Sequence, residues 1–243
     1  MKNTLLMTCS LLALTAGIAA ASGGGLNLGW ADCGGMPASL DQTFACNSNA
    51  GTRTLFGSFV APCCITAMSA NEIVMDLQSS GATLPLWWVM RTGGCRPGAM
   101  TGNFDSTGGP FSCYDYWQGG AIGTLSMDPP SGNRARIKGV FALPEGDSRI
   151  VGVPEGTEVY SFKCNINNSK TTGLGACSGC TSGVDIVLNS IKCNQPVSEP
   201  GGSKFVSAPA NRNYIDWQHG CAGCSAATPA RNTTWGSVKA LYR

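Results

Sequence analysis

The segment from residue 158 to residue 167 alternates apolar and polar side chains with a period of two. On an extended strand, successive side chains point to opposite faces, so the apolar residues of this segment share one face. That face carries Tyr160, Phe162, Cys164 and Ile166. The polar residues, Lys163 among them, share the other face. The pattern predicts a strand with one buried face and one face that meets water.

Four further segments alternate in the same way, at residues 55–60, 73–78, 134–143 and 184–191. Clusters of glycine, proline, serine and aspartate separate these segments, and such residues favour tight turns. Short strands at this spacing favour an all-β fold built as an antiparallel β-sandwich. In such a sandwich we expect Phe162 to pack against inward residues of the other segments, namely Ile137, Phe141, Ile186 and Leu188.

The first 21 residues have the three parts of a secretory signal peptide. Lys2 supplies a positive start, residues 5–18 form an apolar stretch that includes Cys9, and residues 19–21 are small. We therefore expect cleavage after about residue 21 and a mature protein that is secreted or held at the cell surface, with the periplasm as an alternative. No later apolar segment is long enough to span a bilayer, so we expect no membrane span after cleavage.

Cysteine is abundant in this chain. Of 13 cysteines, Cys9 belongs to the predicted signal, which leaves twelve in the mature chain. An even number in an exported protein is typical of a disulfide framework that ties its loops. Because short loops cost the least entropy to close, we expect local bridges from Cys33 to Cys46 and from Cys95 to Cys113. We also expect few or no free thiols.

The chain carries little charge. Charged residues make up 12% of the sequence, against about 25% in typical soluble domains, and the formal net charge is +2. A chain with so little positive charge lacks the basic surface that nucleic-acid binding requires.

Residues 22–194 are predicted to form the sandwich domain. Residues 195–243 are too few for a secure core and are expected to pack on the sandwich as a cysteine-containing extension.

Three stretches carry a resemblance to known sequences: LNLGWADCG at residues 26–34, TTGLGACSGC at residues 171–180 and TWGSVKALYR at residues 234–243. They resemble exported proteins of environmental bacteria that have no assigned function. The order of the predicted strands over residues 134–191 is similar to that of immunoglobulin-like sandwiches of the cohesin and carbohydrate-binding-module kind. The second resemblance implies an immunoglobulin-like fold and a binding role.

Two Cys-x-x-Cys pairs are the sharpest local motifs. They are Cys177 with Cys180, and Cys221 with Cys224, and His219 lies beside the second pair. Four thiolates can hold zinc tetrahedrally, but an oxidising compartment favours structural disulfides. We therefore expect disulfides at these four cysteines, with no metal and no cofactor. The adjacent Cys63 and Cys64 allow either a strained bridge between neighbours or separate partners.

Aromatic side chains are the candidate ligand-binding residues. Flat rings can stack on sugars, and the candidates are Trp87, Trp88, Tyr114, Tyr116 and Trp117, with Trp217 as a further aromatic. If residues 86–91 form a strand, Trp87 and Trp88 face opposite sides, so at most one of them is an exposed platform. The alternative is that these rings fill the core, where aromatic residues supply much of the buried area.

A hydrolytic site would have to use His219, the single histidine, with Asp216 three residues before it. No Gly-x-Ser-x-Gly sequence accompanies them, so no catalytic residue is assigned.

The sequence thus favours a non-enzymatic exported β-sandwich with a binding, adhesive or structural role and an extracellular glycan or surface protein as partner. A carbohydrate-binding module that uses the aromatics is the alternative, and an extracellular hydrolase is a more distant one.

Overall fold

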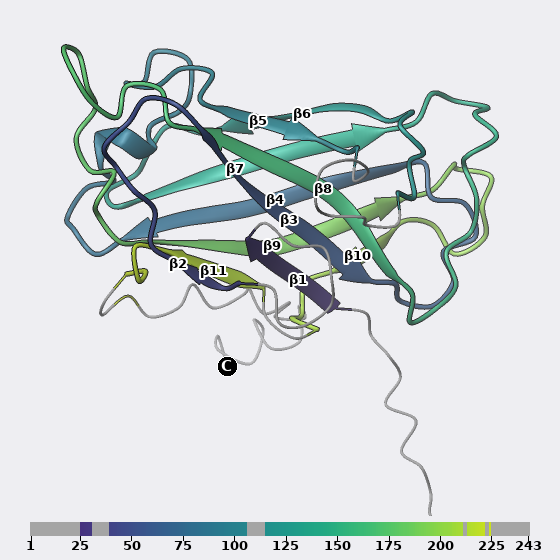
Figure 1. The fold of residues 1–243 in the computed structure, drawn as a ribbon. Helices are drawn as coiled ribbons and strands as arrows, with labels where there is room; N and C mark the ends of the chain where they lie inside the picture. Colours follow the sequence, from purple (N-terminus) through teal and green to yellow (C-terminus); the bar gives the residue numbers. More distant parts are fainter. Residues whose placement is uncertain (1–24, 31–38, 106–114, 211–212, 222–223, 225–243) are drawn as a thin grey trace, which may run out of the picture.

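The computed structural model describes residues 25–30, 39–105, 115–210, 213–221 and 224. Over these residues nearly all regular structure is β-strand, as Figure 1 shows. The strands are β1 (Gly25–Trp30), β2 (Asp41–Gln42), β3 (Thr52–Val60), β4 (Ala70–Ser79), β5 (Met100–Asn103), β6 (Ile122–Met127), β7 (Arg134–Ala142), β8 (Glu158–Asn167), β9 (Val184–Asn194), β10 (Lys204–Val206) and β11 (Tyr214–Trp217). One short 3-10 helix, η1 (Leu86–Trp88), interrupts them in the part of the chain described.

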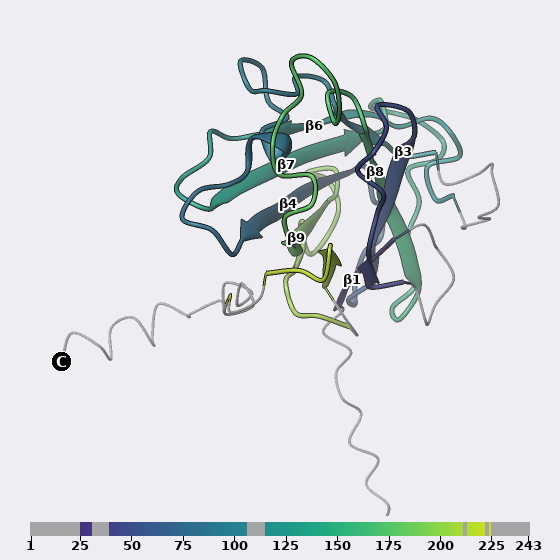
Figure 2. The same ribbon diagram turned by 60° about the vertical axis from the view of Figure 1, so that its left-hand side comes forward.

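The strands form two sheets. The smaller has four strands in the order β1-β3-β8-β5, and the larger has seven, in the order β2-β11-β9-β4-β7-β6 with β10 also paired to β9. Every paired neighbour runs antiparallel except β2 and β11, which run parallel. Figure 2 separates the two layers, with β6, β7, β4 and β9 on one side and β8, β3 and β1 on the other. The predicted all-β sandwich is confirmed, and each of the five predicted strands lies within or largely overlaps an observed strand.

The core lies between the two sheets, where inward residues of β8 face those of β7 and β9. Phe162 is fully buried, and its ring stacks on that of Phe141 with centroids 6.4 Å apart. Ile137, Ile186 and Leu188 belong to the same buried cluster. Phe141 is therefore confirmed as a packing partner of Phe162, and the other three predicted residues lie in the same buried cluster.

The alternation in β8 breaks at one position, and this corrects the expectation for Tyr160. Gly57 lies opposite Phe162 while Ser58 lies opposite Tyr160, so Ser161 is an extra residue in a β-bulge. Ser161 is buried: its hydroxyl accepts a hydrogen bond from Asn71 Nδ2 at 2.8 Å. The extra residue turns Tyr160 partly toward solvent instead of into the core.

The two sheets are joined along one side by the chain that follows residue 195. Strands β10 and β11 both pair with β9 of the larger sheet. Between them, the backbone of Leu26 in β1 donates to Ala208 O at 2.8 Å and accepts from Ala210 N at 3.0 Å. The indole of Trp30 also donates to Asp216 O at 3.0 Å. The later part of the chain therefore holds an edge of each sheet.

Candidate functional site

Two long-range disulfides meet on one loop at the end of the sandwich that lies on the left in Figure 1. This loop, residues 168–183, joins β8 to β9 and is called the braced loop below. Cys180 is bonded to Cys46, 134 residues away, and Cys177 is bonded to Cys95, 82 residues away. Closing loops this long removes about 4 to 5 kcal/mol of entropy from the unfolded chain for each bridge. Two other loops are thereby fixed to the braced loop.

These bridges correct the predicted pairings. Cys46 and Cys95 are disulfide-bonded as expected, but to Cys180 and Cys177 rather than to their near neighbours in sequence. Cys33 and Cys113, the partners expected from loop length, lie outside the described residues. Loop length predicts only the entropic cost of closing a bridge in the unfolded chain. In the native fold, the Cα atoms of Cys46 and Cys180 lie 5.9 Å apart and those of Cys95 and Cys177 lie 6.0 Å apart, which are distances that a disulfide spans.

Side-chain hydrogen bonds fix the braced loop further. Asn49 Oδ1 accepts from the backbone N–H groups of Thr171 and Thr172 at 2.7 and 2.9 Å. The indole of Trp87 donates to Thr171 Oγ1 at 2.9 Å, and the backbone N–H of Trp87 donates to Ser178 O. The loop is thus held at its base by covalent bonds and along one side by a polar network.

A buried arginine also donates a hydrogen bond to the braced loop. The Arg96 side chain is almost fully buried and donates to the backbone oxygens of Trp87, Asn167 and Ser169. Its guanidinium also lies 3.4 Å from the centroid of the Trp87 ring, an arrangement that attracts the cation to the ring face. Burial lowers the pKa of Arg96 to about 10, so the side chain is still protonated at neutral pH.

The tip of the braced loop presents one apolar side chain. Leu174 is fully exposed and lies between Gly173 and Gly175, which have φ angles of 83° and 79°. Side chains disfavour this left-handed region, so two glycines here permit a tight, well-defined turn. A shallow hollow of about 310 Å³ lies on the same loop, lined by residues that include Thr171, Ala176 and Ser178. The tip and the hollow lie on one loop that the disulfides hold in place.

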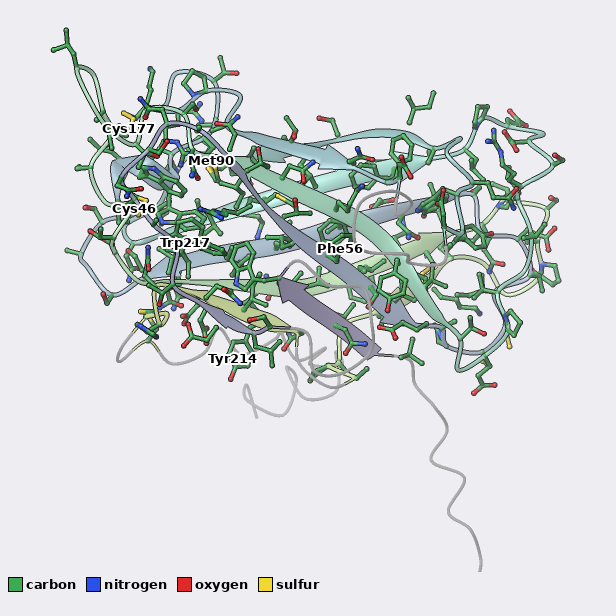
Figure 3. The ribbon with its side chains drawn as sticks, viewed as in Figure 1. Cys46, Phe56, Met90, Cys177, Tyr214 and Trp217 are labelled. Carbon is green, nitrogen blue, oxygen red and sulfur yellow. A yellow bond between two sulfur atoms is a disulfide. The ribbon has the colours of Figure 1, made fainter. Side chains whose placement is uncertain are left out.

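The structure places the predicted ligand-binding aromatics in the core. Trp87, Trp88, Tyr116 and Trp117 are all buried, and so is Trp217, while Tyr114 lies outside the described residues. The rings of Trp87, Trp88 and Trp217 pack against one another with centroids 5.0 to 5.3 Å apart. Figure 3 shows Trp217 inside the end of the sandwich that carries Cys46 and Cys177. These four candidates offer no exposed ring face to a sugar, which corrects the expectation of an aromatic platform.

His219 forms a hydrogen-bonded chain that sequence reasoning missed. Its Nδ1 lies 3.0 Å from Asp41 Oδ2, and its Nε2 lies 3.0 Å from Thr43 Oγ1. The order of hydroxyl, imidazole and carboxylate is that of a hydrolase triad. However, the His219 side chain is 76% exposed, so water competes for each contact. Asp216, the partner considered from sequence, is not the carboxylate that contacts the ring.

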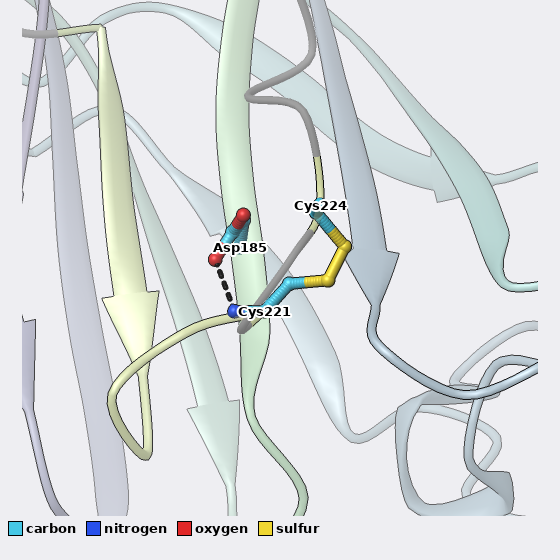
Figure 4. A group of neighbouring side chains, drawn as sticks. All are labelled: Asp185, Cys221 and Cys224. Carbon is cyan, nitrogen blue, oxygen red and sulfur yellow. Dashed lines mark hydrogen bonds between the residues drawn. A yellow bond between two sulfur atoms is a disulfide. The ribbon is translucent and has the colours of Figure 1, made fainter.

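The second Cys-x-x-Cys pair lies beside the turn that carries His219. Cys221 and Cys224 are bonded to each other, and Asp185 Oδ1 accepts the backbone N–H of Cys221 at 2.7 Å (Figure 4). The three ligand-type atoms of Asp185, Cys221 and Cys224 lie within 4.8 Å of one another. In this structure the two sulfurs are bonded to each other and the carboxylate fixes the turn, so the group acts as a local clasp.

Gly220, which immediately precedes this clasp, is expected to be important for stability. It has a φ of 69°, and a Cβ at this position would lie 2.4 Å from Asp185 Oδ1. We expect Gly220→Ala to lower the free energy of unfolding by about 2 to 4 kcal/mol, from backbone strain and overpacking together. Gly146, with a φ of 78° and no atom within 4 Å of the new Cβ, is the matched control. Gly146→Ala should cost only the strain, about 1 kcal/mol. Equal losses in urea unfolding would contradict the close approach.

Four cysteines are free among the described residues, which corrects the expectation that nearly all pair. Cys164 and Cys193 are buried on β8 and β9, where burial raises the pKa of each thiol to about 12. They fill the core as small apolar side chains. Cys63 and Cys64 are exposed instead, and neither forms a disulfide.

Comparison with known proteins gives no family assignment. No protein-family model matches the chain, and no curated protein matches it. Over the described residues, no helix has the length and apolar character needed to cross a bilayer.

Proposed function

We propose that this chain is an exported, non-enzymatic binding protein whose contact surface is the tip of the braced loop. The observation that carries the proposal is the pair of long-range disulfides that hold this loop while Leu174 is fully exposed at its end. Loops on a rigid scaffold are the usual place for recognition residues. This exposed, rigid loop is therefore a better candidate for a binding surface than the aromatic rings, which are buried.

Export is supported by the chemistry of the cysteines. Three disulfides join described residues, and such bonds persist in oxidising compartments outside the cytoplasm. The signal-like sequence of residues 1–21 points to the same location. The proposal therefore places the protein in the extracellular space, at the cell surface or in the periplasm.

Rigidity is the physical advantage of the braced loop. A flexible loop loses conformational entropy when it binds, and this loss weakens the complex. The loop here is already held by two disulfides and by the Asn49 and Trp87 hydrogen bonds. Binding through Leu174 would thus cost little additional ordering.

The charge of the braced loop indicates the class of partner. Lys170 is its single charged residue, and the ammonium group donates to Cys95 O at 3.0 Å. A loop with a single charge and an apolar tip suits an apolar pocket on a protein better than an anionic polymer or a sugar. We propose an extracellular or surface protein as the partner.

Leu174→Asp is expected to abolish binding without loss of stability. A carboxylate at the tip cannot enter an apolar pocket without losing its hydration, and Leu174 is fully exposed, so the fold should tolerate the change. The measurement is binding to an array of immobilised surface proteins beside a glycan array. Ile122→Asp, at an exposed apolar residue of β6, is the control and should retain binding. Binding confined to glycans, and equal in Leu174→Asp and the unaltered protein, would contradict the proposal.

The non-enzymatic part of the proposal has its own test at His219. The Thr43–His219–Asp41 chain lies open to water, whereas triads act where water is largely excluded. We expect the protein to hydrolyse an activated ester such as p-nitrophenyl acetate no faster than Thr43→Ala does. A rate that falls at least tenfold in Thr43→Ala and is kept in Thr43→Ser would identify an enzyme.

A further inference from the structure

The free thiols Cys63 and Cys64 lie in the loop between β3 and β4, at the end of the sandwich opposite the braced loop. This is the right-hand end in Figure 1, where β3 ends and β4 begins. Both side chains are exposed. Exposed thiols in an oxidising compartment are the ones that form disulfides, either within the chain or with another chain.

A bridge between the two neighbours is disfavoured by geometry. Consecutive Cα atoms are about 3.8 Å apart across a trans peptide bond, whereas disulfides join Cα atoms about 4.4 to 6.8 Å apart. Each of the other described cysteines is either bonded already or buried in the core. The described partners within the chain are therefore unsuitable for Cys63 and Cys64.

Two other loops meet the loop that carries the two thiols. Gln195 Nε2 donates to Cys64 O at 3.3 Å, and Ile65 forms a bridge with Val153, so three loops meet beside the thiols. These loops and the start of β10 carry three of the exposed large apolar side chains of the described chain, which are Val151, Val197 and Phe205. Apolar side chains that gather on a surface mark a site of protein contact.

Charges of both signs lie at the same end. Glu155 and Lys204 are close enough to Cys63 to shift its pKa in opposite directions, and Glu199 accepts from Thr66 Oγ1 at 2.7 Å. In a two-fold contact the same surface meets itself, so a patch with both signs can pair its acids with the bases of the other copy. A patch of one sign would instead repel itself.

We infer that this end of the sandwich is an interface between two copies of the chain, joined covalently through Cys63 and Cys64. The surface defined by Cys63, Cys64, Val151, Val197 and Phe205 is called the thiol patch. Dimerisation at the thiol patch leaves the braced loops of both copies exposed at the far ends. The proposed dimer would then be bivalent for the partner of the braced loop, although the interface itself does not depend on that function.

The cross-link forms by thiol–disulfide exchange with a small disulfide such as oxidised glutathione. A Cys63 or Cys64 thiolate attacks it, which forms a mixed disulfide and releases one glutathione thiolate. A thiolate of the second copy then displaces the other glutathione, so two protein thiols are oxidised and one glutathione disulfide is reduced. The hydrogen bond and charge of Cys64 raise the pKa of Cys63, so the exchange should accelerate as the pH rises above neutral.

The test is oxidation of the purified full mature chain with oxidised glutathione, followed by non-reducing electrophoresis, light scattering and peptide mapping. We expect a covalent dimer whose linking peptides contain Cys63 and Cys64. Cys63→Ser/Cys64→Ser should form no covalent dimer. Val197→Asp/Phe205→Asp should slow the cross-linking at least about tenfold, because two buried apolar contacts are replaced by like charges. Ile122→Asp/Val140→Asp, on the outer face of the larger sheet, is the matched control and should cross-link normally.

Three outcomes would overturn the inference: a Cys63–Cys64 bridge within one chain, a monomer whose two thiols remain open to maleimide after oxidation, or equal cross-linking in the Val197→Asp/Phe205→Asp and control variants. The dimer and the proposed binding function can fail independently. The Leu174→Asp variant is tested by its binding to the partner, and the substitution leaves the thiol patch unchanged.

Discussion

Phe162→Ala is expected to lower the free energy of unfolding by about 3 to 5 kcal/mol, because it removes a large buried ring from a packed core. Phe162 has no exposed surface and stacks on Phe141. Its ring also covers Gly57 on β3, where an added Cβ would lie only 2.1 Å from the ring. Little around the ring can move in to fill the space, so most of the cavity should remain.

Lys163 is the matched control for Phe162. It is the next residue on β8, and its side chain is partly exposed on the other face of the strand. Lys163→Ala should cost about half a kcal/mol or less, as expected for a site with few contacts. Urea unfolding of both variants measures the difference. Equal losses would mean that the inward and outward assignments of this part of β8 are reversed.

Arg96→Met is expected to cost about 3 to 5 kcal/mol, an effect similar in size to that of Phe162→Ala. Methionine preserves much of the length but leaves three backbone oxygens without their donor, and each buried unsatisfied group costs about 1 to 3 kcal/mol. The contact between the guanidinium and the Trp87 ring is also lost. Because the pKa of Arg96 is about 10, the loss should be the same at about pH 6 and about pH 8.

Two further substitutions separate the causes of the Arg96 effect. Arg96→Lys keeps the charge, but one ammonium group cannot reproduce the planar fork that reaches three oxygens, so it should recover less than half of the loss. Arg91→Met, at a partly exposed arginine in the same loop, should cost about half a kcal/mol or less. If Arg96→Lys matched the unaltered protein, the charge alone would be responsible and the hydrogen-bond geometry would be irrelevant.

The strands could be predicted because one face of each is buried, and burial leaves a period-two pattern in the sequence. The error at Tyr160 has a physical cause that the pattern does not contain. The bulge at Ser161 depends on hydrogen bonds from Asn71 and Trp117, which lie on other parts of the chain. A single inserted residue then reverses the face of every residue before it.

The candidate site could be predicted only in part, because its contacts join residues far apart in sequence. The two Cys-x-x-Cys pairs look alike, yet Cys221 and Cys224 bond to each other while Cys177 and Cys180 bond to distant partners. Connectivity depends on which loops the fold brings together, and spacing does not encode that. The same holds for His219, whose contact with Asp41 spans 178 residues.

The tryptophans illustrate a third kind of failure. A strand over residues 86–91 would place Trp87 and Trp88 on opposite faces, but the two residues lie in the 3-10 helix η1, where both rings are buried in the core. The indole N–H of Trp87 finds an acceptor in Thr171 of the braced loop. Composition identified the aromatic residues, whereas their burial depends on this local change of backbone.

The most direct test of the braced loop is to map the disulfides of the purified protein by mass spectrometry after proteolysis without reductant. The account predicts one linked peptide pair that contains Cys46 and Cys180 and another that contains Cys95 and Cys177. A bridge between Cys177 and Cys180, or local bridges from Cys33 to Cys46 and from Cys95 to Cys113, would contradict it, because the loop would then lose both of its long-range clamps.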